Sequence, residues 1–251
     1  MPIDGLSLDL FDTLVDLHIE RIPPFMCRGV VRRGTQGVLH AHLARHRLVS
    51  IEEVVTALEA TDAAYRETDD HAAGRERSTN DRFAELCRRL GVAVPTLPDE
   101  LTEAHMAQLR ACVERLPHHA KLLRELARTV PIALCSNFSH ATTARRVLAD
   151  ADLDSSLAAV VISEEQGYRK PRGEIFDAVC RALALPPDRV LHVGDRLQED
   201  VGGARAAGLA TAWLTRRVSD PEAERARHPT IVPDRVITDL ADLMPLCDPG
   251  R

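Results

Sequence analysis

A carboxylate that follows a short apolar segment is the first feature of this chain that could do chemistry. The segment 6–8 precedes Asp9, and Asp12 and Thr13 follow it, which predicts a short buried strand ending in an acidic turn. In an open α/β sheet, ligands bind just outside the carboxyl ends of the strands, so Asp9 is a candidate for chemistry. Asp and Thr are also ordinary turn formers, and this stretch alone does not decide between the two roles.

Further polar residues stand near the ends of other predicted strands. One such strand ends in Ser136, another runs into an acidic loop with Asp195 and Asp200, and Lys170 precedes the helix that leads into that second strand. If the strands are parallel, these groups face one crevice and suit an anionic substrate. Carboxylates that lie close together disfavour ionisation unless a cation is present, and ligands that are all oxygen favour Mg²⁺. Lys170 is one of only two lysines among 32 basic residues, which singles it out.

The sheet that must position these residues is predicted by the second half of the chain. Strand-like and helix-like segments alternate there, which is typical of a parallel sheet covered by helices on both faces. Strands are expected over 130–135, 158–162, 190–193 and 210–214, helices over 120–128, 141–149, 173–184 and 200–207, and a short strand and helix near 236–243. Residues 216–233 are expected to form a solvated loop.

The block between the first strand and this alternating region has helical character. Residues 18–34 predict an irregular loop or a short hairpin, and apolar residues then recur at helical spacing with no convincing strand. Helices are expected over 37–47, from a capping box at Ser50 and Glu53 onward, over 80–90 and over 99–116. The expected domains are a core of residues 1–16 and 117–251 and an inserted four-helix bundle of residues 17–116.

Composition bounds the class of protein. The chain has 251 residues, 45% of them hydrophobic, with a net charge of −6 and a pI near 6.0, so we expect a globular protein that does not bind nucleic acid through a basic surface. No apolar run approaches ~18 residues and no basic and apolar leader is seen, so we expect a cytoplasmic protein without a membrane partner. Six scattered cysteines without a C-x-x-C pair predict buried free thiols. The oligomeric state, monomer or homodimer, is left open.

On these motifs the chain resembles the haloacid dehalogenase (HAD) superfamily over nearly its whole length. Residues 9–13 resemble its first motif, Ser136 its second, Lys170-Pro171 its third, and residues 194–200 its fourth. The inserted helical block resembles the C1-type cap of that superfamily. The resemblance therefore implies a Rossmann-like α/β core with a central parallel sheet and an inserted helical cap domain.

The resemblance also implies an activity and roles for the residues. The chain would be a Mg²⁺-dependent phosphatase for a small phosphorylated metabolite, in which Asp9 attacks phosphorus and forms an aspartyl-phosphate. Ser136 and Lys170 would be catalytic and, with Asn137, would bind the phosphoryl group. The metal ligands would be Asp9, the backbone carbonyl of Phe11, Asp195, and Asp200 directly or through water.

The first motif departs from the phosphatase pattern at Phe11, where phosphatases of the superfamily carry the general acid and base Asp. Asp12 follows, at a position where the family has a turn residue, and we interpret it as structural. Without an acid at position 11 the chain cannot protonate a poor leaving group in the usual way. A group from the inserted block could replace it, and His18, Arg21 and Arg28 are candidates. A phosphonatase would need a lysine in the cap, and residues 17–116 contain none, so that activity would require Lys121, just beyond the cap, to reach the site.

Two alternatives to a phosphatase remain. In 2-haloacid dehalogenases the position of Phe11 is typically aromatic and no metal is used, but those enzymes lack the acid that stands here as Asp195. A catalytically impaired protein that binds a phosphorylated ligand is the other alternative, although it would not need a nucleophile at Asp9. The histidines of the first expected helix, His40, His42 and His46, are interpreted as a solvated helix face rather than a metal site.

Overall fold

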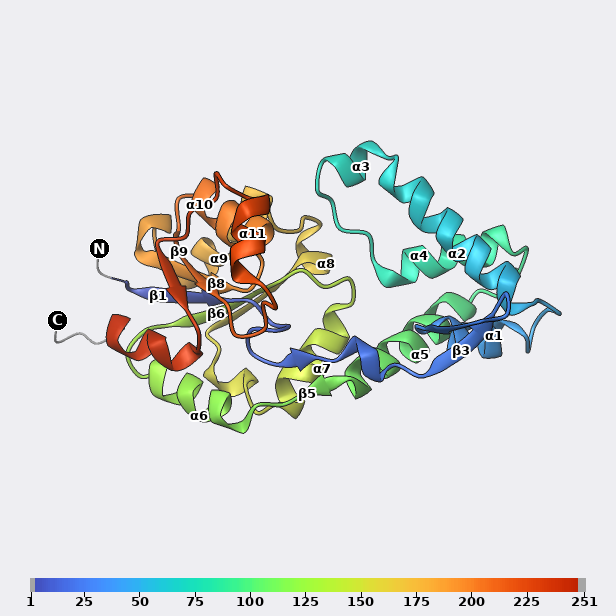
Figure 1. Ribbon diagram of the computed structural model, residues 1–251, viewed down its shortest axis with the longest axis horizontal. Coiled ribbons are helices and arrows are strands. Elements are labelled where there is room, and N and C mark those ends of the chain that lie inside the picture. The colour runs from blue at the N-terminus through green and yellow to red at the C-terminus, as the bar shows by residue number, and fades with distance from the viewer. Residues whose placement is uncertain (1–2, 248–251) are drawn as a thin grey trace. The chain divides into compact units, whose positions relative to one another are not determined.

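The computed structural model describes residues 3–247 and divides into two compact units. One unit combines the N-terminal segment through Asp16 with the chain from Arg115 onward, and the other spans Leu17–Glu114 (Figure 1). A two-stranded sheet of β2 (Asp16–Leu17) and β5 (Val113–Glu114) lies where the chain passes from one unit to the other and back.

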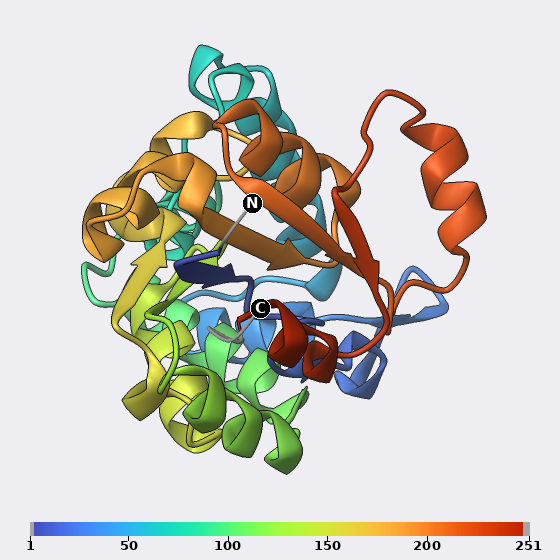
Figure 2. The same ribbon diagram turned by 90° about the vertical axis from the view of Figure 1, so that its left-hand side faces the viewer.

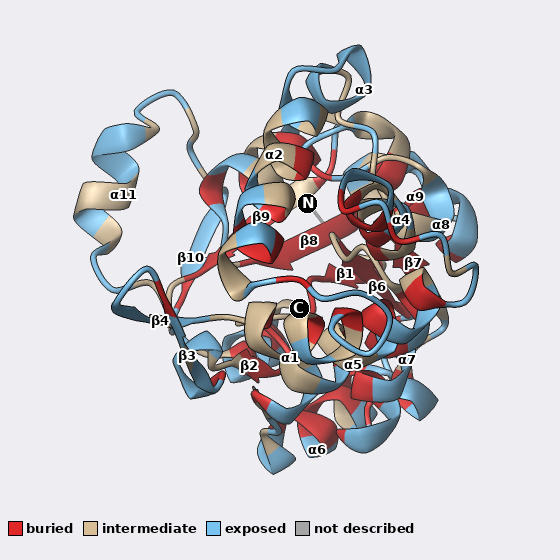
Figure 3. Ribbon diagram, turned by 90° about the vertical axis from the view of Figure 1, so that its right-hand side faces the viewer, coloured by how far each residue is buried: buried red, intermediate tan, exposed pale blue. Residues whose placement is uncertain are grey.

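A six-stranded parallel sheet forms the centre of the first unit, in the order β10-β9-β8-β1-β6-β7. Its strands are β1 (Gly5–Leu8), β6 (Ile132–Ser136), β7 (Ala159–Ile162), β8 (Val190–Gly194), β9 (Ala210–Leu214) and β10 (Arg235–Ile237). Leu6 of β1 pairs with Ile132 on one side and Leu191 on the other. All residues of β1, β6 and β8 are buried, as Figure 3 shows by colour, because helices cover both faces of the sheet.

Helices of the first unit lie on opposite faces of this sheet. The α-helices are α6 (Pro117–Leu126), α7 (Ala141–Asp150), α8 (Ser163–Gln166), α9 (Gly173–Leu183), α10 (Gly203–Ala206) and α11 (Pro221–Arg227). The 3₁₀-helices are η2 (Asp154–Ser156), η3 (Pro187–Arg189) and η5 (Leu240–Leu246), and η4 (Leu197–Gly202) is a π-helix. Figures 1 and 2 show α9 and α10 on one face and α6 and α7 on the other. Apolar side chains of α9, among them Ile175 and Phe176, share a core cluster with Ala133 and Cys135 of β6.

The second unit is a helical bundle preceded by a hairpin. Its elements are η1 (Ile19–Arg21), the antiparallel strands β3 (Pro24–Cys27) and β4 (Val30–Arg33), and the helices α1 (Gln36–Leu43), α2 (Ile51–Arg66), α3 (Asp69–Ala72), α4 (Thr79–Arg89) and α5 (Leu97–Ala111). Leu39, Leu58, Phe83 and Leu101 each come from a different helix and share one buried cluster. The capping box expected at Ser50 is present at the start of α2.

Two expectations about local structure were wrong. The helix expected over 99–116 ends at Ala111, because the residues of β5 run extended to pair with β2. The segment expected to be a solvated loop contains α11, whose first turn is capped by the side chain of Asp220 accepting from the amide of Ala223 at 2.9 Å.

The expectation of buried free thiols agrees with the structure. All six cysteines are buried and free, so the chain has no disulfide among them. Within residues 3–247, no helix combines the length and the apolar character that crossing a membrane would require.

Gly203 allows α10 to approach the loop that carries Lys170. A Cβ at this position would lie 2.7 Å from the Cα of Pro171 and 2.8 Å from Cε2 of Phe176, both too short for a real contact. The Cα of Pro171 belongs to the backbone, so it cannot rotate away as a side chain could. A side chain here would therefore push the Lys170 loop away from the helix that follows the fourth motif.

We expect Gly203→Ala to destabilise the fold by roughly 1–3 kcal/mol, because overpacking forces backbone shifts. Gly173→Ala is the matched control, since a Cβ at Gly173 meets nothing within 4 Å. That control should be neutral or slightly stabilising. Urea denaturation of both variants checks the prediction, and equal stability of the two would show that the packing at Gly203 is not tight.

Candidate active site

The candidate site lies at the carboxyl edge of the parallel sheet. Asp9 directly follows β1, Ser136 ends β6, and Asp195 directly follows β8. Because β1 lies between β6 and β8, these residues stand on three adjacent strands. From β1 the chain runs to β6 and β7 on one side and then crosses to β8 on the other side, so the site is at the point where the strand order reverses. Ligands bind at such switch points in open α/β sheets.

The ammonium of Lys170 is the centre of this site. It is buried, with 3% of the residue exposed, and Nζ donates hydrogen bonds to Oδ1 of Asp9 at 2.6 Å, to Oδ1 of Asp200 at 2.5 Å and to the carbonyl of Cys135 at 2.8 Å. All three donors of the ammonium therefore have an acceptor. Burial alone would lower the pKa of Lys170, but the carboxylates of Asp200 and Asp9 raise it, so the ammonium stays charged.

Asn137 holds the main chain of this lysine. Its Oδ1 accepts from the amide of Lys170 at 2.6 Å, and its Nδ2 donates to the carbonyl of the same residue at 2.9 Å. Both ends of the Asn137 side chain are thus engaged within the protein. The arrangement gives Asn137 a role in positioning Lys170, beside the contact with substrate that the sequence predicts.

Asp200 is hydrogen-bonded on both oxygens. Oδ1 accepts from Lys170 and lies 3.2 Å from Nε2 of His192, and Oδ2 accepts from the amide of Arg196 at 2.9 Å. Burial alone would raise the pKa of Asp200, but Lys170 and His192 hold it well below its usual value, so the carboxylate stays ionised. Gly194 makes room for it, because a Cβ there would lie 2.2 Å from Cγ of Asp200.

The sequence analysis missed His192 and its partner Ser7. These residues pair across β1 and β8, and the hydroxyl of Ser7 lies 2.8 Å from Nδ1 of His192. Burial lowers the pKa of His192, so its imidazole is neutral; Nε2–H then donates to Asp200 and Nδ1 accepts from Ser7. The signal in the sequence was a single polar residue within each of two otherwise apolar strands.

Asp9 and Asp195 are the carboxyl groups whose negative charge the site compensates least. Burial and the charges of Asp9 and Asp200 raise the pKa of Asp195 to about 8, against the opposing effect of Arg196. Burial also raises the pKa of Asp9, against the opposing effect of Lys170, to about 6. One oxygen from each of the three carboxylates lies within 4.8 Å of the others. A donor set of oxygens with surplus negative charge fits Mg²⁺.

Ser136 offers a hydrogen-bond donor beside this cluster. Its Oγ is buried and has no hydrogen-bond partner within the described residues, and the residue is 1% exposed. Buried hydroxyls almost always have a partner, so this one is suited to donate to a bound ligand.

Phe11 and Asp12 form the turn after Asp9. The ring of Phe11 packs against Phe138 with the ring centroids 5.0 Å apart, which makes an apolar surface two residues after Asp9. Asp12 has a φ of 57°, a left-handed conformation that Asp tolerates better than most residues, and its Oδ1 accepts from Nε of Arg217 at 3.2 Å. These contacts agree with our interpretation of Asp12 as structural.

The candidate replacements for the missing acid all have partners inside the second unit. His18 lies 2.7 Å from Glu20, Arg21 donates to Glu114 at 2.7 Å, and Arg28 donates to Thr56 at 2.8 Å. Their role toward substrate stays a prediction.

A model of the haloacid dehalogenase-like hydrolases matches residues 3–208 of this chain. The chain belongs to this family of hydrolases. All four motifs that suggested the superfamily lie within these matched residues.

The relatives of this HAD-like hydrolase differ in activity. An (S)-2-haloacid dehalogenase of Pseudomonas putida is 26% identical over 222 residues, which cover 86% of this chain and 87% of the relative. A phosphoserine phosphatase of Thermus thermophilus is 32% identical over 163 residues, covering 64% of this chain and 61% of the phosphatase. The crystal structure of the HAD-hydrolase YfnB from Bacillus subtilis, bound to magnesium, matches with a TM-score of 0.58 at 20% identity and covers 99% of this chain and all of that one. This last match shows the shared fold.

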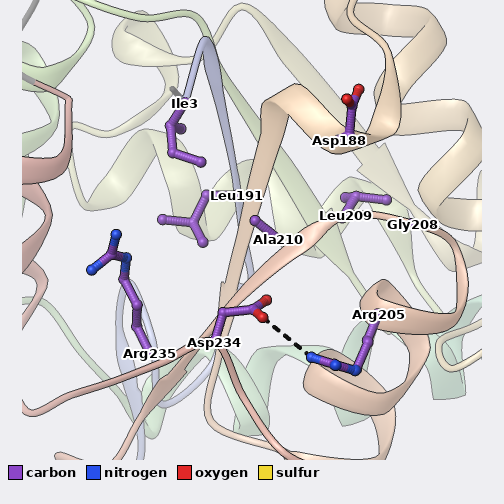
Figure 4. Close-up of a pocket in the computed structure, with 9 residues that line it drawn as sticks. All are labelled: Ile3, Asp188, Leu191, Arg205, Gly208, Leu209, Ala210, Asp234 and Arg235. Carbon is purple, nitrogen blue, oxygen red and sulfur yellow. Dashed lines mark hydrogen bonds and ion pairs between the residues drawn. The ribbon is translucent and has the colours of Figure 1, made fainter. Parts of the chain in front are cut away.

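A pocket of about 470 Å³ in this HAD-like hydrolase lies at the opposite edge of the sheet (Figure 4). Leu191, Ala210 and Arg235 stand at or next to the first residues of their strands, and an ion pair between Arg205 and Asp234 spans one side at 3.2 Å. The residues of the four motifs do not line it, so we do not assign the reaction to this pocket.

In metal-free buffer, replacing Asp195 by Asn and replacing Asp200 by Asn should change the stability of the fold in opposite directions. The raised pKa of Asp195 means that the folded protein retains a proton that the unfolded chain releases, so stability falls as pH rises from 3.8 toward about 8. Asp195→Asn should therefore stabilise the fold by roughly 1–3 kcal/mol near neutral pH, and the gain should vanish near about pH 4. The lowered pKa of Asp200 gives stability above 3.8 that is lost in acid.

Asp200→Asn should accordingly destabilise the fold by roughly 3–5 kcal/mol near neutral pH, because it leaves the buried ammonium short of a counter-charge. Chemical denaturation of both variants in the presence of a chelator measures the difference. Two variants that shift stability in the same direction would contradict the charges assigned to these two carboxyl groups.

Proposed function

We propose that this HAD-like hydrolase is a Mg²⁺-dependent phosphatase that acts on a small phosphorylated metabolite through an aspartyl-phosphate on Asp9. The observation that carries the proposal is Asp195, a third carboxylate that the single ammonium of Lys170 does not neutralise. A metal-free displacement at carbon has no use for this surplus charge, whereas a divalent cation compensates it. The similarity to a phosphoserine phosphatase supports the same reaction class.

Lys170 holds the proposed nucleophile, Asp9, through one of its two carboxylate oxygens. Lys170 donates to Oδ1 of Asp9, which orients the carboxylate and leaves Oδ2 to attack phosphorus. The new bond joins Asp9 to phosphorus, the bond from phosphorus to the ester oxygen breaks, and water then hydrolyses the aspartyl-phosphate to release phosphate and restore Asp9. Ser136 donates to a phosphoryl oxygen and Lys170 offsets charge on the phosphoryl group as it transfers.

The metal would be held by Asp9, Asp195, the carbonyl of Phe11 and Asp200, and when bound it would neutralise charge on the transferring group. Asp200 already accepts hydrogen bonds on both oxygens, from Lys170 and from Arg196. We therefore propose that Asp200 acts on the metal through a water molecule, and that Asp9 and Asp195 supply the direct carboxylate ligands.

We further propose that the unit spanning Leu17–Glu114 is a C1-type cap that selects the substrate, and that the remainder of the chain is the catalytic core. The compactness of each unit supports this division. A specificity domain inserted directly after the nucleophile strand is expected to bring its residues to the same substrate.

A second candidate function is hydrolysis of 2-haloacids. Two observations favour it: the aromatic Phe11 at the position of the missing acid, and the similarity to an (S)-2-haloacid dehalogenase over 86% of this chain. In that reaction Asp9 would attack carbon and expel halide, and water would hydrolyse the resulting ester. Asp195 opposes this candidate, because dehalogenases of the superfamily lack that acid.

The deciding assay is phosphate release from para-nitrophenyl phosphate with and without Mg²⁺, beside halide release from 2-chloropropionate. We expect release of phosphate that requires the metal and is lost by at least about 10³-fold in Asp9→Asn, which removes the nucleophile. Asp12→Asn is the matched control, because it makes the same change three residues away and should keep turnover within a few fold. Halide release without phosphate release would establish the dehalogenase instead. If neither product is released, the remaining candidate is a protein that binds a phosphorylated ligand without turnover.

Phe11→Asp should restore the missing general acid. We expect turnover of alkyl phosphates, whose leaving groups need a proton, to rise by roughly 10²-fold, with little change for para-nitrophenyl phosphate. Phe11→Asn controls for the loss of the ring without adding an acid. An unchanged rate in Phe11→Asp, with a folded protein, would mean that another residue already supplies the proton.

A further inference from the structure

A second group of metal-binding side chains lies in the first unit, apart from the acidic cluster. His118 and His119 stand in the first turn of α6, and Asp239 is the N-cap residue of η5. One ligand atom from each of the three lies within 4.8 Å of the others. Figure 2 shows η5, in dark red near the C-terminus, beside α6 in green.

His119 is oriented as a metal-binding histidine would be. The residue is fully buried, and its Nδ1 lies 3.0 Å from the carbonyl of Leu14, to which it must donate because a carbonyl only accepts. In the neutral ring Nε2 then carries a lone pair. That atom is also buried and has no hydrogen-bond partner within residues 3–247. A buried lone pair on one ring nitrogen with a carbonyl bound to the other is the arrangement by which proteins orient histidine ligands.

The other two side chains are placed to complete the set. His118 is exposed, and its ring lies 4.4 Å from that of His119 between centroids, with the planes nearly perpendicular. Asp239 is partly buried, and its Oδ1 accepts from the amide of Ala241 at 2.8 Å, which fixes the side chain at the start of η5. Because the imidazole of His118 is exposed, it can rotate toward the other two ligand atoms.

One positive charge lies close by and must be accounted for. The guanidinium of Arg216 interacts favourably with the carboxylate of Asp239 and disfavours a positive charge on His119. It is paired through two hydrogen bonds with the carboxylate of Asp16, so its charge is largely compensated. It therefore does not prevent a cation from binding to the cluster.

We propose that His118, His119 and Asp239 bind a divalent transition-metal ion of the zinc class, with water in the remaining position. Two imidazoles and a carboxylate are typical zinc ligands, whereas Mg²⁺ prefers sites made of oxygen alone. The ion would join α6 to η5. Because His119 also binds the carbonyl of Leu14, the ion would stabilise the segment that follows Asp9.

Zinc titration by calorimetry on the whole protein tests this site, with excess Mg²⁺ present to occupy the acidic cluster. We expect one zinc ion per chain, and an affinity that falls by roughly 100-fold or more in His118→Ala and in Asp239→Asn. Neither variant removes a buried side chain, and Asn keeps the capping function of Asp239, so both should fold.

Two matched variants control for the substitutions themselves. His46→Ala removes an exposed imidazole from the second unit, and Asp220→Asn changes the N-cap of α11 in the same way that Asp239→Asn changes that of η5. Both controls should bind zinc as the unaltered protein does. The proposal is overturned if the unaltered protein binds no zinc under these conditions, or if either His118→Ala or Asp239→Asn keeps the full affinity.

Discussion

The site depends on a single buried ammonium. Removing a lysine from water costs several kcal/mol unless every donor finds an acceptor and the charge is balanced. Lys170 meets both conditions through Asp9, Asp200 and the carbonyl of Cys135. Most of the local features described above serve this arrangement: Asn137 fixes the lysine backbone, and the absent side chain of Gly194 leaves space for Asp200.

The balance of charge around this ammonium explains why the pKa values of Asp195 and Asp200 shift in opposite directions. Asp200 takes hydrogen bonds on both oxygens, and Asp9 shares the ammonium with it. Among the residues that the structure describes, Asp195 has only the distant Arg196 as an ion-pair partner, with 3.9 Å between the closest atoms, so its burial is not compensated. One lysine cannot neutralise three acids. The site is therefore short of positive charge for three ionised acids, a shortage that a divalent cation would remove, and the proposed phosphatase chemistry makes use of that cation.

Much of this site could be predicted from the sequence, because parallel strands end at the same edge. The polar residue after each apolar strand, such as Asp9, Ser136 and Asp195, had to lie there once the alternation of strands and helices was recognised. The contact between His192 and Ser7 could not be predicted, since it depends on the register of two strands that are far apart in the chain. Short elements were also missed: a two-residue strand such as β5 has no periodicity to detect, and its structure comes from pairing with β2.

The position of β1 in the sheet has a consequence for how the protein is made. Leu6 leaves the ribosome well before its partners Ile132 and Leu191, which lie more than a hundred residues later in the chain. The bundle of Leu17–Glu114 is contiguous in sequence and can fold as soon as it is synthesised, whereas the sheet lacks neighbours for its central strand until much later. Contacts between residues so distant in sequence slow folding, because a long loop must close before they form. During synthesis, the strand that ends before Asp9 stays unpaired until these partners are made, which leaves it open to chaperones and to aggregation.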